Sequence, residues 1–238
     1  MTLPKQLGHS PISEAAVEIR FDTTLPSDAV FGMTYGTLKE DYPAVEKLPI
    51  LQLPEALREN DPNLQFQPQY RLRRGNFLVQ IGPRTLSIVA IDRYPGWTAF
   101  RGEIVNVFNR VRDLGIIKRV TRFGLRYIDF FEVNIFERLE LQVLVRNEDK
   151  AQQKLVVRVE QPNGNYFTTL MVSNDATKTV PSGPRKGSVL DLDTFLPDGS
   201  DDFFDRMTSI LEEAHEIEKT LFFGLLRSDF LDDLKPTY

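Results

Sequence analysis

The residues best suited to chemistry are arginines spaced two apart in segments with the composition of strands. The stretch QYRLRR holds Arg71 and Arg73, and VEIRF joins Glu18 to Arg20. Side chains two residues apart share one face of a strand, and the arginine fork suits carboxylate or phosphate groups. The sequence therefore predicts an anion-binding face, for which the candidates are Arg20, Arg71, Arg73, Arg126 and Arg158.

Two interpretations of these arginines remain open. In the first, arginine and glutamate side chains line a cavity that holds an anion. In the second, they lie on exposed sheet faces and form cross-strand ion pairs. The segment KLVVRVE, which places Arg158 and Glu160 on one face, is compatible with both.

Asp191 and Asp193 in LDLD are the candidates for a metal site. They share one face of the expected strand, and oxygen ligands of this kind bind Mg²⁺. The same pair would equally serve to end a strand or to pair with arginine. A protein that only binds a partner would need no cofactor at this pair. An enzyme that acts on phosphoesters would use it to hold Mg²⁺.

Other catalytic equipment is sparse in the sequence. It contains two histidines, His9 and His215, and no cysteine, and it lacks HExxH, GxxxxGK[ST], GxSxG and GxGxxG. His215 lies beside an apolar helical stripe, where we expect packing or hydrogen bonding. No catalytic residue is therefore assigned, and the sequence favours a protein that is not an enzyme.

Charge is unevenly distributed along the chain. The formal net charge is −5, which argues against indiscriminate DNA binding. Residues 67–126 carry 12 Lys/Arg and 3 Asp/Glu, a net of +9, whereas residues 191–238 carry 4 and 13, a net of −9. These segments either attract each other inside the fold or present an arginine-rich face to an anionic partner.

Composition is that of a globular protein with a substantial core, at 41% hydrophobic and 26% charged residues. The longest apolar runs, such as LFFGLL, fall short of the roughly 20 residues that a membrane span needs. The first residues show no apolar signal-peptide region. We expect a cytoplasmic protein with no membrane partner.

The stretch RFGLRYIDFF resembles an RNA-binding strand at first sight. Its glycine is misplaced for that motif, and period-two alternation puts Phe123, Leu125 and Tyr127 on one face. Nucleic acid is therefore an unfavoured partner. We expect the three apolar side chains to pack inward. Arg126 and Asp129 serve either an internal ion pair or a ligand, and we favour the ion pair.

Alternation, helical periodicity and turn signals predict the same order of elements in two halves, 1–117 and 118–238, within one continuous structural unit. Predicted strands lie at 15–22, 48–53, 69–74, 76–82, 85–92, 119–133, 139–146, 154–160, 165–172 and 188–195. Predicted helices lie at 26–42, 97–114 and from 200 onward, and 173–186 is predicted to be a mobile loop. The fold class is α+β, a pseudo-duplicated antiparallel sheet packed on two long helices, TBP-like or helix-grip-like.

Four motifs, SPISEAAVEIRF, GLRYID, LDLDTF and AHEIEKTLFFGLL, occur in order along nearly the whole chain. Their order and spacing resemble an uncharacterised, sporadically distributed prokaryotic protein family of about this length. The resemblance implies a standalone bacterial or archaeal protein. Sporadic occurrence would suit a mobile, defence-type locus.

These observations predict a non-enzymatic binding or accessory protein whose arginine-rich face engages a protein or an anionic ligand. A homodimer is among the assemblies that the sequence allows. The alternative is a metal-dependent enzyme acting on phosphoesters or nucleotides through an anion pocket lined by arginine and glutamate.

Overall fold

The computed structural model describes residues 3–238 and combines helices with a large antiparallel sheet. Its nine strands follow the order β10–β11–β12–β7–β2–β6–β5–β4–β3. The predicted α+β class with an antiparallel sheet is confirmed. The strands are β2 (Ile12–Asp22), β3 (Ala44–Lys47), β4 (Tyr70–Arg74), β5 (Phe77–Ile81), β6 (Thr85–Ile91), β7 (Arg119–Phe131), β10 (Val156–Asn163), β11 (Tyr166–Val180) and β12 (Gly183–Leu196).

Helices and short strands complete the fold. The helices are α1 (Ser27–Leu38), α2 (Glu55–Asn60), α3 (Trp97–Arg112), α4 (Phe203–Leu225) and α5 (Ser228–Asp233), with 3₁₀ turns η1 (Pro49–Gln52) and η2 (Ile135–Glu137). Two small pairs are β1 (Gln6–Leu7) with β13 (Pro236–Thr237), and β8 (Leu144–Val145) with β9 (Glu148–Asp149). Within residues 3–238, none of the helices has the length and apolar character needed to cross a bilayer.

The chain divides into two compact units, each assembled from separate stretches of sequence. Unit 1 comprises residues 3–14, 126–194 and 213–238, and unit 2 comprises residues 15–125 and 195–212. Strands β2, β7 and β12 and helix α4 each run from one unit into the other.

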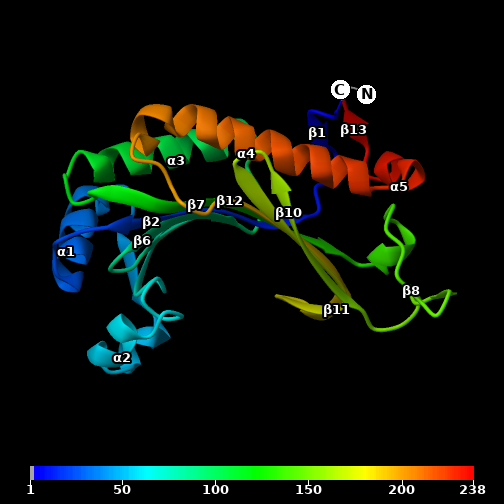
Figure 1. The fold of residues 1–238 in the computed structure, drawn as a ribbon, viewed down its shortest axis with the longest axis horizontal. Coiled ribbons are helices and arrows are strands. Elements are labelled where there is room, and N and C mark those ends of the chain that lie inside the picture. Colours follow the sequence, from blue (N-terminus) through cyan, green and yellow to red (C-terminus); the bar gives the residue numbers. More distant parts are fainter. Residues whose placement is uncertain (1–2) are drawn as a thin grey trace. The chain divides into compact units, whose positions relative to one another are not determined.

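Unit 2 is built from short antiparallel hairpins and a packed helix. The turn at Gly75-Asn76 joins β4 to β5 as predicted, and Arg74 lies opposite Phe77. Gly75 has φ +55°, a conformation that suits glycine in a tight turn. Helix α3 lies against one side of β6, and α2 lies on the other side of these strands (Figure 1). The buried residues of α3 include Phe100, Ile104, Val107, Phe108 and Val111, as its periodicity predicts.

Unit 1 has its own apolar cluster between the strands and the C-terminal helices. The side chain of Phe131 packs against Phe230 of α5, with ring centroids 5.7 Å apart. The cluster is formed by Phe131, Ile135, Phe136, Leu139, Leu170, Val172, Leu190, Leu192, Leu226, Phe230 and Leu234. Alternate residues of β11 and β12 supply its sheet side, because side chains of a strand alternate between faces.

Strand β7 follows the predicted alternation closely. Phe123 and Leu125 are fully buried in unit 2, and Tyr127 is buried in unit 1. Asp129 has the same parity and is also buried. The buried face of β7 therefore carries the carboxyl group of Asp129 in line with three large, mainly apolar side chains.

Several predicted elements are wrong. The 48–53 strand is the 3₁₀ turn η1, and 139–146 is irregular apart from β8. Strand β3 and helix α2 lie in segments for which the sequence predicted no regular element. All of these pieces are short, so local propensity and pattern carry little information about them.

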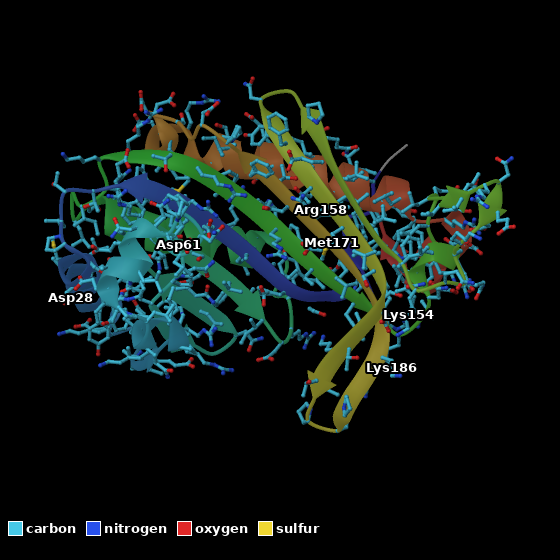
Figure 2. All side chains as sticks on the ribbon, turned by 60° about the horizontal axis from the view of Figure 1, so that its bottom comes forward. Asp28, Asp61, Lys154, Arg158, Met171 and Lys186 are labelled. Carbon is cyan, nitrogen blue, oxygen red and sulfur yellow. The ribbon has the colours of Figure 1, made fainter. Side chains whose placement is uncertain are left out.

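The predicted mobile loop 173–186 is instead a continuous hairpin of β11 and β12 (Figure 2). Its polar side chains are exposed or half-buried on the two strands, so polarity does not exclude strand pairing here. The two-residue turn at Pro181-Ser182 closes it, and the β-branched Thr177, Thr179 and Val180 favour extended backbone. Lys178 anchors the hairpin, donating to Ser13 Oγ at 2.8 Å.

Candidate functional site

Arg20 is the candidate arginine with the most defined setting. Its Nε donates to Glu18 Oε1 at 2.9 Å, and its guanidinium carbon lies 4.7 Å from the centroid of the Phe66 ring. Glu18 and Arg20 share a face of β2 because they are two residues apart. Among the described residues, no hydrogen-bond partner contacts the two terminal Nη groups of Arg20, and its side chain is 35% exposed.

Arg122 of β7 approaches the same carboxylate. Its Nη1 lies 3.5 Å from Glu18 Oε1, and its guanidinium lies over the Phe195 ring at 4.7 Å. Two guanidinium groups from neighbouring strands thus share one carboxylate oxygen, each stacked on its own aromatic ring. Cation–π contact of this kind fixes the plane of a guanidinium without using its donors. Sequence reasoning missed Arg122 because its strand partner is known only once β2 and β7 are paired.

The other two candidates of unit 2 pair with acids on adjacent elements. Arg71 Nη1 donates to Glu46 Oε2 at 3.1 Å, and Arg73 Nη2 lies 3.5 Å from Asp92. Both pairs are partly or largely exposed, so each contributes on the order of 0–1 kcal/mol. Arg71 Nε is buried and has no hydrogen-bond partner among the described residues.

Arg126 forms a bidentate ion pair in unit 1. Its Nε and Nη2 donate to the two carboxylate oxygens of Asp191 at 2.8 and 2.5 Å. This hydrogen bonding to Asp191 raises the pKa of Arg126 above its usual value, although burial opposes it. Arg126 does form an internal ion pair, with Asp191 as the partner. The expected ion pair of Asp129 is wrong, because its carboxyl group is buried and no cationic side chain among the described residues pairs with it.

Arg158 lies on β10, with its side chain 65% exposed. Its Nη2 is 3.8 Å from Glu160 Oε2, on the same face of the strand. Figure 2 shows Arg158 on this strand beside Met171 of β11, its partner in the register. Each of the five predicted arginines therefore contacts a carboxylate of its own unit.

The proposed metal ligands are placed differently from each other. Asp191 is buried and both its oxygens are engaged by Arg126, whereas Asp193 is half-buried on the same strand. Among residues 3–238, the structure contains no cluster of three or more acidic or histidine side chains suited to holding a metal ion. A metal ion at Asp191 would have to compete with the Arg126 guanidinium.

Sequence reasoning assigned no site to a pair of buried carboxyl groups in unit 1, Asp129 of β7 and Glu218 of α4. Burial raises the pKa of Asp129 to about 8, and the charge of Asp191 adds to the effect. Burial also raises the pKa of Glu218 well above its usual value, and nearby Asp193 and Asp129 contribute. Asp129 is therefore largely protonated at neutral pH.

The hydrogen bonding of this pair is incomplete. Glu218 Oε1 accepts from the backbone N–H of Thr194 at 3.0 Å. Among the described residues, Glu218 Oε2 and Asp129 Oδ1 are buried without a partner. Such groups cost free energy unless they are neutral or satisfied. The parity of Asp129 within β7, and the position of Glu218 four residues after Ala214 of the apolar stripe, were the available sequence signals.

His215 lies one helical turn before Glu218 on α4 and contacts β7, the strand that carries Asp129. Its Nδ1 is 3.2 Å from the hydroxyl oxygen of Tyr127. Tyr166 extends the polar contacts of α4 by donating to Glu213 at 2.9 Å. The expected hydrogen-bonding role of His215 is thus met by Tyr127.

The oppositely charged segments meet in several ion pairs. Arg101 of the basic segment pairs with Glu212 of the acidic one, and Arg119 pairs with Asp201 at 2.9 Å, both within unit 2. The Arg126–Asp191 pair joins the same two segments within unit 1. Some of the basic residues of 67–126 are therefore paired with acidic residues of 191–238 within the fold.

No family model matches the chain, and no curated protein gives a significant match to its sequence.

Proposed function

We propose that this chain is a non-enzymatic binding protein that engages an anionic partner through arginines on its sheet, with Arg20 as the principal contact. The observation that carries the proposal is the setting of Arg20, held by Glu18 through Nε and by the Phe66 ring. Its Nη groups remain available to a carboxylate or a phosphate.

An arginine fixed in this way is suited to recognition. Holding a long side chain normally costs rotamer entropy when a partner binds. Arg20 has already lost much of that freedom, because one edge and one face of its guanidinium are engaged. An anion that reaches the two Nη groups meets donors that are already positioned.

Two other arginine pairs of unit 2 are also exposed enough to exchange their carboxylate partners. The Arg71–Glu46 and Arg73–Asp92 pairs are weak in water because they are partly or largely exposed. An acidic partner can replace Glu46 or Asp92 at little net cost. Arg126 contributes less to this proposal, because Asp191 already occupies its fork.

The proposal also covers the type of fold, the cellular location and the genomic context of the protein. The order strand, short helix, several strands and long helix occurs before and after residue 118, which supports a pseudo-duplicated, helix-grip-like or TBP-like fold. We place the protein in the prokaryotic cytoplasm as an accessory component of a mobile, defence-type locus. The motif order from SPISEAAVEIRF to AHEIEKTLFFGLL supports this placement.

Affinity capture from a lysate of the source cells tests the proposal. The purified chain serves as bait at low and at high salt, with and without nuclease treatment. We expect a reproducible acidic protein or phosphorylated ligand whose recovery falls as salt rises, because exposed charge contacts are screened. Recovery of no reproducible anionic molecule would overturn the proposal.

A further inference from the structure

Strand β10 ends the large sheet and has an open backbone edge. Its neighbour in the sheet is β11, and it is the first strand in the strand order. The side chains of Val156 and Val159 are 68% and 43% exposed. An edge with exposed valines is a template for pairing with another strand.

The register with β11 identifies the backbone groups at the open edge. The two-residue turn Gly164-Asn165 closes at the pair Asn163–Tyr166, and hydrogen-bonded pairs alternate along the hairpin from there. The backbone of Val157, Val159 and Gln161 accordingly points toward β11. The N–H of Asn174 on β11 donates to Leu155 O at 3.3 Å, in agreement with this alternation.

The even-numbered residues of β10 consequently direct their backbone groups to the open edge. These residues are Val156, Arg158, Glu160 and Pro162. Pro162 has no N–H, and an edge-facing position is where a strand tolerates proline. Arg158 and Glu160 each offer a free donor and acceptor to a further strand.

We propose that β10 pairs antiparallel with β10 of a second copy of this chain, around a two-fold axis at Val159. This register sets Arg158 opposite Glu160 of the second copy, and Glu160 opposite its Arg158. Each opposed pair exchanges two backbone hydrogen bonds, because both residues point their N–H and C=O outward. The strand is therefore complementary to itself in charge and in hydrogen bonding.

Neighbouring registers lack this complementarity. Centring the axis on Arg158 opposes two arginines, and centring it on Glu160 opposes two glutamates, which is unfavourable on a strand pair. Within one chain, Arg158 and Glu160 are 3.8 Å apart and exposed, so their mutual contact is weak and readily exchanged. Arg158 and Glu160 thus disfavour pairing of β10 with unrelated strands and favour pairing with β10 of a second copy.

Val157 and Val159 lie on the face of β10 opposite to Arg158 and Glu160. Val159 meets Val159 of the second copy at the axis. Val157 packs on the apolar cluster of unit 1, so this side of β10 is already fixed by the core. The interface extends a preformed sheet and needs no rearrangement of the strand.

Reciprocal charge substitutions test the proposal, with sedimentation equilibrium as the measurement. We expect the wild-type chain to form a dimer of twice the 27.3 kDa protomer mass. Arg158→Glu and Glu160→Arg each oppose like charges, so each variant alone weakens dimerisation by about tenfold or more. Mixing the two variants restores a dimer, because one copy then carries two acidic and the other two basic side chains.

Two further variants make the outcome decisive. The double variant Arg158→Glu/Glu160→Arg restores the complementary pairs and should dimerise alone. Arg206→Glu makes the same charge change on α4, where Arg206 is exposed, and should dimerise like wild type. A monomeric wild-type chain would overturn the proposal, as would single variants that dimerise normally or a mixture that stays monomeric. Thermal unfolding of each variant verifies that the fold is intact.

Discussion

The guanidinium of Arg126 holds both carboxylate oxygens of Asp191, through Nε at 2.8 Å and Nη2 at 2.5 Å. Asp191 is buried, and its charge acts on the pKa of buried Asp129. Arg126 thus compensates the charge of a carboxylate that water scarcely reaches. The pair is a structural element of unit 1 as well as a candidate site.

Removing the Arg126 side chain should therefore destabilise the chain. Arg126→Ala leaves Asp191 buried and unpaired, and we expect a loss of about 1–3 kcal/mol in the free energy of unfolding. Urea denaturation at pH 7 measures it. Arg112→Ala is the matched control, because Arg112 is exposed and pairs with its neighbour Asp113, and it should change stability by less than about 0.5 kcal/mol. Equal effects of the two substitutions would contradict this role of Arg126.

Stability should fall as pH rises, because Asp129 binds its proton more tightly in the folded chain. Its pKa is raised from 3.8 to about 8 on folding. Between these values the folded state holds more protons than the unfolded state, so the contribution present below pH 3.8 is lost as pH rises to about 8. The slope from this group approaches about 1.4 kcal/mol per pH unit.

Asp129→Asn tests that slope. Asparagine keeps the shape of the side chain and does not titrate, so the variant should lose less stability than wild type between pH 5 and pH 9. Urea unfolding at several pH values measures the difference. Glu218 also has a raised pKa, so a residual slope is expected in the variant. Parallel pH profiles for wild type and variant would contradict the assignment.

Two glycines should respond in opposite directions to alanine. Gly199 has φ +61°, and a Cβ there would collide with the carbonyl oxygen of Val120. Gly199→Ala should destabilise the chain by about 1–3 kcal/mol.

Gly102 is exposed inside α3, and a Cβ there would meet no neighbour. Gly102→Ala should stabilise the chain by about 0.5–1 kcal/mol. Urea unfolding that shows the same sign for both would contradict these placements.

The longer elements could be predicted because local chemistry and periodicity agree. Gly75-Asn76 marks a hairpin, and the apolar residues of α3 recur at helical spacing from Phe100 to Val111. Tertiary context decides the hairpin of β11 and β12 instead. Its strands are polar and carry Gly183 and Pro184, so composition alone indicates a loop. Pairing along both strands satisfies the backbone regardless of what the side chains expose.

The sequence indicated which arginines belong to the candidate site, but it did not indicate which carboxylate each arginine contacts. Arginines two apart on a strand indicate a shared face, but the sequence does not reveal which carboxylate lies opposite each one. Glu46 and Asp191 are distant in sequence from Arg71 and Arg126, and become partners only through sheet pairing. Asp129 was expected to form an ion pair and Glu218 was assigned no role, because the sequence does not show that folding buries both carboxyl groups.

Phe66 supplies an intermediate test of the binding proposal. Phe66→Leu removes the ring under the Arg20 guanidinium and preserves every charge. A cation–π contact contributes about 0.5–1 kcal/mol at an exposed site, so the captured anionic partner should bind a few-fold more weakly. Titration of the purified partner measures the change. Unchanged affinity would show that the ring does not position Arg20.

The most direct measurement of the central claim is partner capture by matched arginine variants. Wild type, Arg20→Ala, Arg20→Lys and Arg112→Ala are used as baits, and the retained anionic molecules are quantified. Arg112 is the control, because it is exposed and contacts its neighbour Asp113. Arg20→Ala should reduce affinity about tenfold or more through the loss of charge-assisted hydrogen bonds, and lysine should restore only part of it. Arg112→Ala should capture like wild type, and equal capture by Arg20→Ala would contradict the account.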